Sequence, residues 1–189
     1  FWVLGAIGLY ALAGAATTPM GGLVASGFYL ILPYGVIASR SFQPDPLMTA
    51  LIVFGVLALH RWSRGPSLRR AAAAGTVCGA AILVKAVAAF PLLGALAGIG
   101  LSVRGLRRGL RDPQLWAMAA LALLPSAVYY LFVTRQGSSG LFSFWVLSLR
   151  DLPGQPSFYV RWVQQTEYVI GFGWLRPPPI PFFSFSSLA

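Results

Sequence analysis

A short polar segment between two apolar runs holds the side chains best suited to chemistry. Residues 39–48 read Ser-Arg-Ser-Phe-Gln-Pro-Asp-Pro-Leu-Met and include one of only four acidic residues in the chain. Asp45 lies between two prolines, where its carboxylate can cap the following helix, with Pro46 at the first helical position, or bind a cation or a hydroxyl-bearing substrate. Arg40 can anchor the segment at a membrane surface or clamp a phosphate, because its guanidinium fork matches phosphate oxygens.

The single lysine is the second candidate for chemistry. Lys85 stands in the otherwise apolar 33-residue run 71–103. An ionised lysine at the centre of a bilayer costs about 3 kcal/mol, so this side chain must reach water or a polar partner. One interpretation is that Lys85 extends to the membrane surface at the tip of a helical hairpin. The other is that it supplies a cation for a lipid-linked phosphate that arrives from the outer leaflet.

The composition identifies a membrane protein. Of the residues in the chain, 57% are hydrophobic and 10% are charged. In soluble domains about a quarter of the residues are charged. Despite the net charge of +10, the arginines cluster in two short loops, residues 60–70 and 104–112, with four arginines in each. Short loops of this kind face the cytoplasm, and a nucleic-acid partner is excluded because it requires a basic face outside the bilayer.

The remaining polar residues suggest no further chemistry. Cys78 is a lone cysteine in an apolar stretch, which indicates a packing residue and neither a disulfide nor a metal site. His60 adjoins Arg61 at the end of a span and is interpreted as interfacial and not as a metal ligand, and Asp151 and Glu167 are assigned to a solvated face. Neither a glycine-rich phosphate loop nor a serine nucleophile motif is present.

A length argument sets the expected topology. A helix over 71–103 would measure about 50 Å, much more than the ~30 Å hydrocarbon core. Because both flanks are basic loops, we expect a helical hairpin with its tip between Lys85 and Pro91, which brings Lys85 to the same outer side as Asp45. Pro33 predicts a kink or break before the polar segment. The predicted core over 1–133 has spans at about 1–15, 23–38, 47–60, the hairpin 71–103, and 113–133, the last opened by Asp112-Pro113 as a helix cap.

The chain beyond this core is expected to stay on the outer side. Residues 134–175 are predicted to be an interfacial segment that contains an amphipathic helix from Ser157 to about Ile170. Residues 176–189 are expected to form an extended, proline-rich tail, with truncation or an altered reading frame suspected before it. The predicted fold class is therefore all-α, a polytopic transmembrane helical bundle with an interfacial amphipathic helix on its outer face.

The order of these features resembles a known family. Residues 39–48, a basic loop and then Ile82-Leu83-Val84-Lys85 in a double-length apolar run resemble the GT-C class of membrane glycosyltransferases. The most similar group is the PMT or glycosyltransferase-39 family, which includes dolichyl-phosphate-mannose-protein mannosyltransferases and lipid A aminoarabinose transferases. The resemblance covers roughly residues 1–133 and implies a GT-C-like bundle in the plasma (inner) membrane, with its active face extracytoplasmic.

The resemblance implies transfer of a sugar from a polyprenyl-phosphate carrier to a protein or lipid acceptor. Asp45 matches the acidic residue of the family's second outer loop and is the expected catalytic-site residue, where it orients the donor or a divalent metal. Lys85 and Arg40 are the expected ligands of the lipid phosphate. The family's principal catalytic acid belongs to a first outer loop that is not found in this sequence, so the chain is expected to be an internal fragment, inactive alone. Ala86 departs from the family's usual glycine after the lysine.

Two other classes of function remain open on sequence grounds. A transporter or flippase of lipid-linked glycans predicts charged residues facing a cavity in several spans. The spans here are nearly free of such residues apart from Lys85. A purely structural membrane subunit has no need of the polar segment 39–48.

Overall fold

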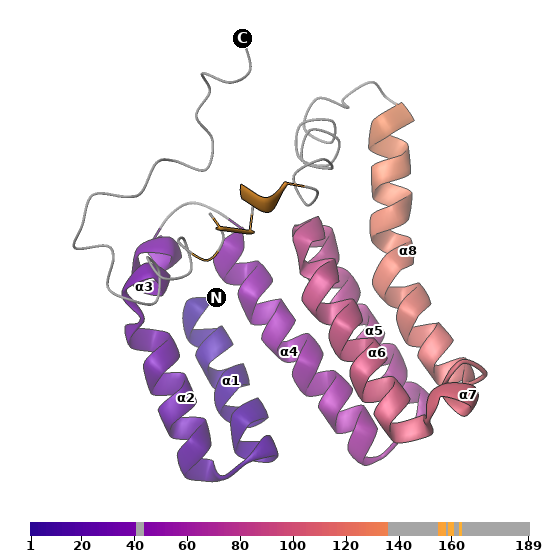
Figure 1. The fold of residues 1–189 in the computed structure, drawn as a ribbon, viewed down its shortest axis with the longest axis horizontal. Coiled ribbons are helices and arrows are strands. Elements are labelled where there is room, and N and C mark those ends of the chain that lie inside the picture. The colour runs from indigo at the N-terminus through magenta and orange to yellow at the C-terminus, as the bar shows by residue number, and fades with distance from the viewer. Residues whose placement is uncertain (41–43, 136–154, 158, 161–162, 164–189) are drawn as a thin grey trace. The chain divides into compact units, whose positions relative to one another are not determined.

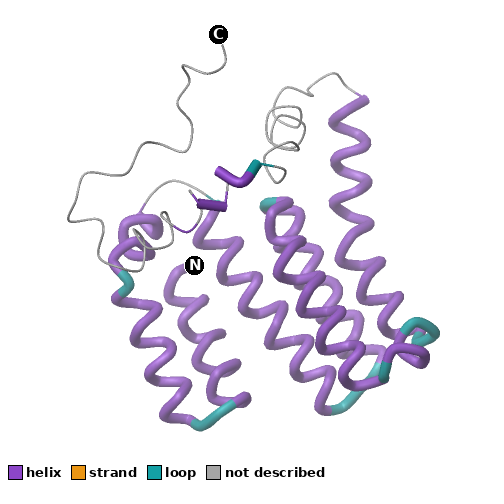
Figure 2. Tube along the Cα trace, in the orientation of Figure 1, coloured by secondary structure: helices purple, strands orange, loops and turns teal. Residues whose placement is uncertain are grey.

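The computed structural model describes residues 1–40, 44–135, 155–157, 159, 160 and 163. Every regular element in this part of the chain is helical, which confirms the all-α class (Figures 1 and 2). The elements are α1 (Trp2–Ala16), α2 (Pro19–Ile31), α3 (Pro33–Arg40), α4 (Asp45–Arg64), α5 (Leu68–Val84), the 3₁₀ turn η1 (Ala86–Ala88), α6 (Ala89–Arg104), α7 (Leu106–Gly109) and α8 (Pro113–Arg135).

The chain divides into two compact units, residues 1–132 and 133–189. In the first unit, α4, η1 with α6, and α8 are long and apolar enough to cross a membrane, while α1 and α2 are shorter apolar helices. The predicted interfacial segment 134–175, with its amphipathic helix, and the predicted tail 176–189 lie almost wholly outside the described residues. So do Asp151 and Glu167.

Prolines and small residues set the ends of several helices. Helix α2 ends at Ile31 and α3 begins at Pro33, which confirms the predicted break at this proline. Helix α5 ends at Val84 and α6 begins at Ala89, so the chain reverses over residues 85–88, within the interval predicted for the tip of the hairpin. Ser67 caps α5 by accepting a hydrogen bond from the Arg70 N–H.

The core of the first unit lies among α4, α5, α6 and α8. Trp62, Leu59, Leu92, Met118 and Cys78 are its largest fully buried side chains. Burial of Cys78 as a free thiol confirms its predicted packing role. Because each of the four helices contributes apolar side chains to one cluster, their ends are held in register with one another.

Helices α5 and α8 approach each other closely through glycine. Gly75 and Gly79 lie one turn apart on α5, and a Cβ at Gly75 would lie 2.9 Å from the Met118 carbonyl oxygen. A Cβ at Gly79 would collide with the Leu121 carbonyl oxygen, which Pro125 leaves without its usual intrahelical donor. The spacing is that of the small-residue motif that lets membrane helices pack backbone to backbone.

Two ends of this helical unit concern function. At the Lys85 end (residues 40, 44–46 and 84–89), α3 stops, α4 starts, and α5 turns into α6. At the arginine-rich end (residues 60–70 and 104–114), α4 turns into α5, and α6 leads through α7 into α8 (Figure 1). The antiparallel order of α4, α5 and α6 therefore separates the lysine from the two basic loops.

Candidate functional site

Asp45 is the first residue of α4, and its carboxylate does not cap that helix. Pro44 occupies the cap position, and its side chain provides no cap hydrogen bond. The capping role considered from sequence is therefore wrong, and Pro46 is the second helical residue instead of the first. A carboxylate in the first turn still interacts favourably with the helix dipole. Its oxygens remain available for another partner.

Lys85 supplies that partner. Its backbone leaves the helical conformation, at φ −157° and ψ 119°, directly after α5. The Lys85 N–H still donates to the Ala81 carbonyl at 3.1 Å, and the Lys85 carbonyl accepts from the Ala88 N–H at 3.0 Å. The ammonium Nζ lies 2.5 Å from Asp45 Oδ1, so two residues that are 40 positions apart in sequence meet at one end of the unit.

The Asp45–Lys85 pair is open to solvent. The Lys85 side chain is 46% exposed and that of Asp45 is 30% exposed. Exposed ion pairs contribute about 0–1 kcal/mol to stability. The contact is therefore too weak to act as a structural clamp, and both charged groups are accessible to a ligand.

Arg40 is the third predicted site residue, and the structure does not join it to the other two. It is the exposed last residue of α3, and residues 41–43, which connect it to Pro44, are outside the described part. No ion pair links Arg40 to Asp45 or Lys85 in the described part of the chain. Its role as a phosphate ligand stays a prediction.

Asp45 is the one described acidic side chain at this end of the unit. Asp112 is at the arginine-rich end, and the described residues contain no group of three or more His, Cys, Asp or Glu side chains that could hold a metal ion. Of the described residues at the Lys85 end, Asp45 alone thus offers a carboxylate to a divalent cation, and Lys85 is positioned to contact an anionic ligand.

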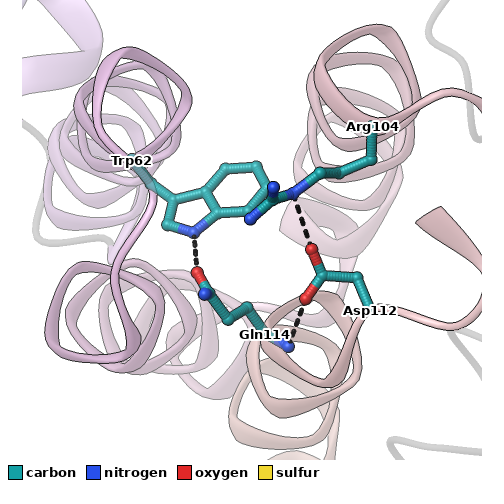
Figure 3. A network of polar contacts seen from close by, with 4 residues as sticks. All are labelled: Trp62, Arg104, Asp112 and Gln114. Carbon is teal, nitrogen blue, oxygen red and sulfur yellow. Dashed lines mark hydrogen bonds and ion pairs between the residues drawn. The ribbon is translucent and has the colours of Figure 1, made fainter. Parts of the chain in front are cut away.

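A second polar cluster, missed by the sequence analysis, lies at the arginine-rich end (Figure 3). The Trp62 indole Nε1–H donates to Gln114 Oε1 at 2.8 Å, and the Gln114 N–H donates to Asp112 Oδ1 at 2.8 Å. Asp112 therefore caps α8, as predicted. Arg104 Nε lies 2.7 Å from Asp112 Oδ2, an ion pair whose angle falls outside hydrogen-bond geometry.

The same arginine lies over the buried tryptophan. The Arg104 guanidinium carbon is 5.9 Å from the centre of the Trp62 ring, within the range of a cation–π contact. Trp62 is fully buried. The sequence held one signal for this cluster, which is the tryptophan inside a basic loop. A buried indole N–H requires a hydrogen-bond acceptor, so a polar partner could have been expected. Its partner, Gln114, is 52 residues away and could not be identified from spacing.

Comparison with known proteins decides the family. Residues 1–132 match the family described as dolichyl-phosphate-mannose-protein mannosyltransferase, and this interval coincides with the first compact unit. The chain belongs to this mannosyltransferase family. No curated protein and no solved structure matches the chain significantly.

Membership confirms the resemblance seen in the sequence. Proteins of this mannosyltransferase family are polytopic integral membrane proteins, in agreement with the long apolar helices. Membership implies a glycosyltransferase of the EC 2.4 type that uses a polyprenyl-phosphate-linked sugar, so the implied partners are the bilayer and a lipid-linked donor.

Proposed function

We propose that this mannosyltransferase-family chain takes part in transferring a sugar from a polyprenyl-phosphate carrier to a protein or lipid acceptor, and that Asp45 and Lys85 belong to its donor site. The contact between Asp45 and Lys85 is the observation that carries the proposal. It places a carboxylate and an ammonium at one helix end, both reachable from solvent. A sugar linked to a phosphate needs both kinds of group.

The reaction assigns a separate role to each charge. The hydroxyl oxygen of the acceptor bonds to the anomeric carbon as the bond between that carbon and the phosphate oxygen breaks. The leaving polyprenyl phosphate keeps the bonding electrons, and the acceptor proton passes to the family's carboxylate of the first outer loop. Lys85 stabilises the negative charge that develops on the leaving phosphate, with Arg40 as a second cation. Asp45 orients the donor sugar or a divalent metal.

The exposure of the pair supports this assignment. The phosphodiester of the donor carries one negative charge, as a carboxylate does, and the leaving phosphate gains further negative charge as its bond to the sugar breaks, so the Lys85 ammonium attracts the leaving group more strongly than the intact donor. On binding, the phosphate takes the place of Asp45 beside the lysine. The carboxylate then turns toward the sugar hydroxyls, so one substrate engages both members of the pair.

We place the donor site on the extracytoplasmic face of the plasma (inner) membrane, and the distribution of arginine supports this orientation. The arginine-rich end has all eight arginines of the two basic loops, and the other arginines among the described residues are Arg40, at the end of α3, and Arg135, at the end of α8. By the positive-inside rule the arginine-rich end faces the cytoplasm, which assigns Asp45 and Lys85 to the outer face.

The activity test uses the full-length protein in proteoliposomes with a polyprenyl-phosphate-linked sugar as donor. We expect Asp45→Asn combined with Lys85→Met to abolish measurable transfer, and Lys85→Arg, which keeps the positive charge, to retain part of it. Wild-type turnover in the double variant rules out the proposed roles. Movement of the intact lipid-linked sugar across the membrane without transfer to an acceptor rules out the proposed reaction.

The orientation test uses single cysteines in a Cys78→Ser background. Val87 on η1 and Leu110 at the arginine-rich end are 50% and 59% exposed and form a matched pair of positions. In intact cells we expect a membrane-impermeant maleimide to label Val87→Cys and not Leu110→Cys. The reverse pattern overturns the assignment of the donor site to the outer face.

A further inference from the structure

The two basic loops form one surface, although they are about 40 residues apart in sequence. Trp62, from the end of α4, donates its indole hydrogen bond to Gln114 at the start of α8. Arg104, at the end of α6, lies over the same indole ring. These contacts hold the loop that follows α4 beside the connection between α6 and α8 (Figure 3).

Among the described residues, only two of the eight arginine side chains make a hydrogen bond or an ion pair. Arg70 Nη1 donates to the carbonyl oxygens of Arg61 at 3.3 Å and Gly65 at 2.9 Å, which ties the turn between α4 and α5. Arg104 pairs with Asp112. The side chains of the other six are exposed and make no hydrogen bond or ion pair with another described residue: Arg61, Arg64, Arg69, Arg107, Arg108 and Arg111.

The short helix α7 presents part of this charge. Gly105, at φ 73°, makes the turn between α6 and α7. Arg107 and Arg108 follow on α7, and Arg111 is the second residue after its end. Asp112 is the one acidic side chain described at this end, and Arg104 already occupies it. The surface is therefore strongly and uniformly positive.

Exposed apolar side chains lie between these arginines in the sequence. Leu68, Leu110 and Trp116 are 65%, 59% and 61% exposed. The Trp116 indole N–H donates to the Leu110 carbonyl at 2.9 Å, which satisfies the polar atom and leaves the ring face uncovered. Arginine mixed with exposed tryptophan and leucine suits the headgroup layer, where charged groups meet water and apolar groups meet acyl chains.

We propose that the arginine-rich end is a binding surface for anionic phospholipid headgroups, built jointly by the two basic loops. A phosphodiester offers the paired oxygens that a guanidinium binds with two hydrogen bonds. Basic clusters beside a transmembrane helix gain affinity for anionic lipids with each arginine. A phospholipid offers an anionic headgroup to the arginines and acyl chains to the exposed leucines and tryptophan, so one ligand satisfies both kinds of side chain. The surface is separate from the donor site and does not depend on the transfer reaction.

The test measures lipid binding to the full-length protein in neutral detergent by native mass spectrometry. Phosphatidylglycerol and phosphatidylcholine are titrated in parallel. We expect phosphatidylglycerol to bind in preference, and its affinity to fall at least about tenfold in either Arg61→Gln/Arg64→Gln/Arg69→Gln or Arg107→Gln/Arg108→Gln/Arg111→Gln. Loss in both triple variants is the result expected if the loops act as one surface.

The matched control keeps the charge. Arg107→Lys/Arg108→Lys/Arg111→Lys is expected to retain most of the affinity for phosphatidylglycerol. Wild-type affinity is also expected to fall as salt rises from about 0.05 to 0.5 M, a measurement that stands even where a glutamine variant fails to fold. Equal affinity for the two lipids, wild-type affinity in the glutamine variants, or insensitivity to salt overturns the proposal. If inorganic phosphate, at the same concentration as phosphatidylglycerol, saturates the surface, the surface binds free phosphate and the proposal of a lipid site is wrong.

Discussion

In the part of the chain that the structure describes, each end of the helical unit has one ion pair between an aspartate and a basic side chain, and the two pairs differ in their surroundings. In the Asp45–Lys85 pair the side chains are 30% and 46% exposed, and in the Asp112–Arg104 pair they are 10% and 33% exposed. Asp112 also caps α8, and Arg104 also lies over the buried Trp62. Asp45 caps nothing.

The difference separates an ion pair that is part of the fold from one that is available to a ligand. The Asp112 carboxylate has partners on both oxygens, so removing it leaves both an arginine and a helix end without a partner. The Asp45–Lys85 pair has solvent on its open side and contributes little to stability. Mutation of Asp112 or Arg104 should therefore reduce stability, and mutation of Asp45 or Lys85 should reduce activity.

The largest expected effect on stability is that of Trp62→Ala. Removal of a fully buried indole together with its hydrogen bond should lower the free energy of unfolding by about 3–5 kcal/mol. Thermal unfolding of the purified protein in neutral lipid measures the loss. Trp116→Ala is the matched control, because this tryptophan is 61% exposed and also donates one hydrogen bond. Equal destabilisation by the two substitutions contradicts the structural role of Trp62.

The largest expected effect on activity is that of Lys85→Met. Loss of the cation beside the leaving phosphate should lower the rate of sugar transfer by about 100- to 1000-fold. The free energy of unfolding should change by less than about 1 kcal/mol, because the pair is exposed. Arg104→Met should give the opposite pattern, with lower stability and nearly normal activity per folded molecule. If both methionine variants lose activity and stability together, the distinction between the two ends is wrong.

The two aspartates provide a comparison within one residue type. Asp112→Ala removes both the α8 cap and the partner of Arg104, and should cost about 1–3 kcal/mol of stability. Asp45→Ala should cost less than about 1 kcal/mol. Chemical or thermal unfolding of both variants under the same conditions measures the difference. A cost at Asp45 that equals the cost at Asp112 shows that the exposed pair supports the fold.

The smallest expected effect is that of salt. Raising the ionic strength to about 1 M shortens the Debye length to about 3 Å, which weakens an exposed pair more than a partly buried one. Unfolding of wild type and Lys85→Met should therefore converge at high salt. The difference between wild type and Arg104→Met should persist, since Arg104 and Asp112 are less exposed. A salt-independent gap for Lys85→Met contradicts the solvent exposure of its pair.

The sequence predicted that Lys85 and Asp45 lie on the same side of the bundle, for physical reasons that act over whole segments. The length of the run 71–103 and the two basic loops required a reversal of the chain near the lysine, and the structure has it at residues 85–88. Pro33 likewise ended a helix where expected. These features depend on bilayer thickness, loop charge and the missing N–H of proline, which are readable without tertiary contacts.

Contacts between distant side chains were not predictable in the same way. The hydrogen bond from Trp62 to Gln114 depends on how α4 and α8 pack, and no spacing rule connects these two residues. The predicted cap by Asp45 failed because the helix begins one residue early, with Pro44 in the cap position. The role of Arg40 as a phosphate ligand remains a prediction, based on its neighbours in sequence.

Pro125 sets a boundary within α8. Before it, Leu115, Met118 and Ala122 are buried in the common core, and the Leu121 carbonyl faces Gly79. After it, apart from the buried Ser126, the helix presents exposed Val128, Tyr129, Leu131 and Phe132. Since the proline has already removed one backbone hydrogen bond at this level, the second half of α8 can tilt at little cost while the first half stays fixed against α5. Bending at Pro125 can thus leave the packing of α8 on α5 intact, and with it the helices that hold Asp45 and Lys85 together.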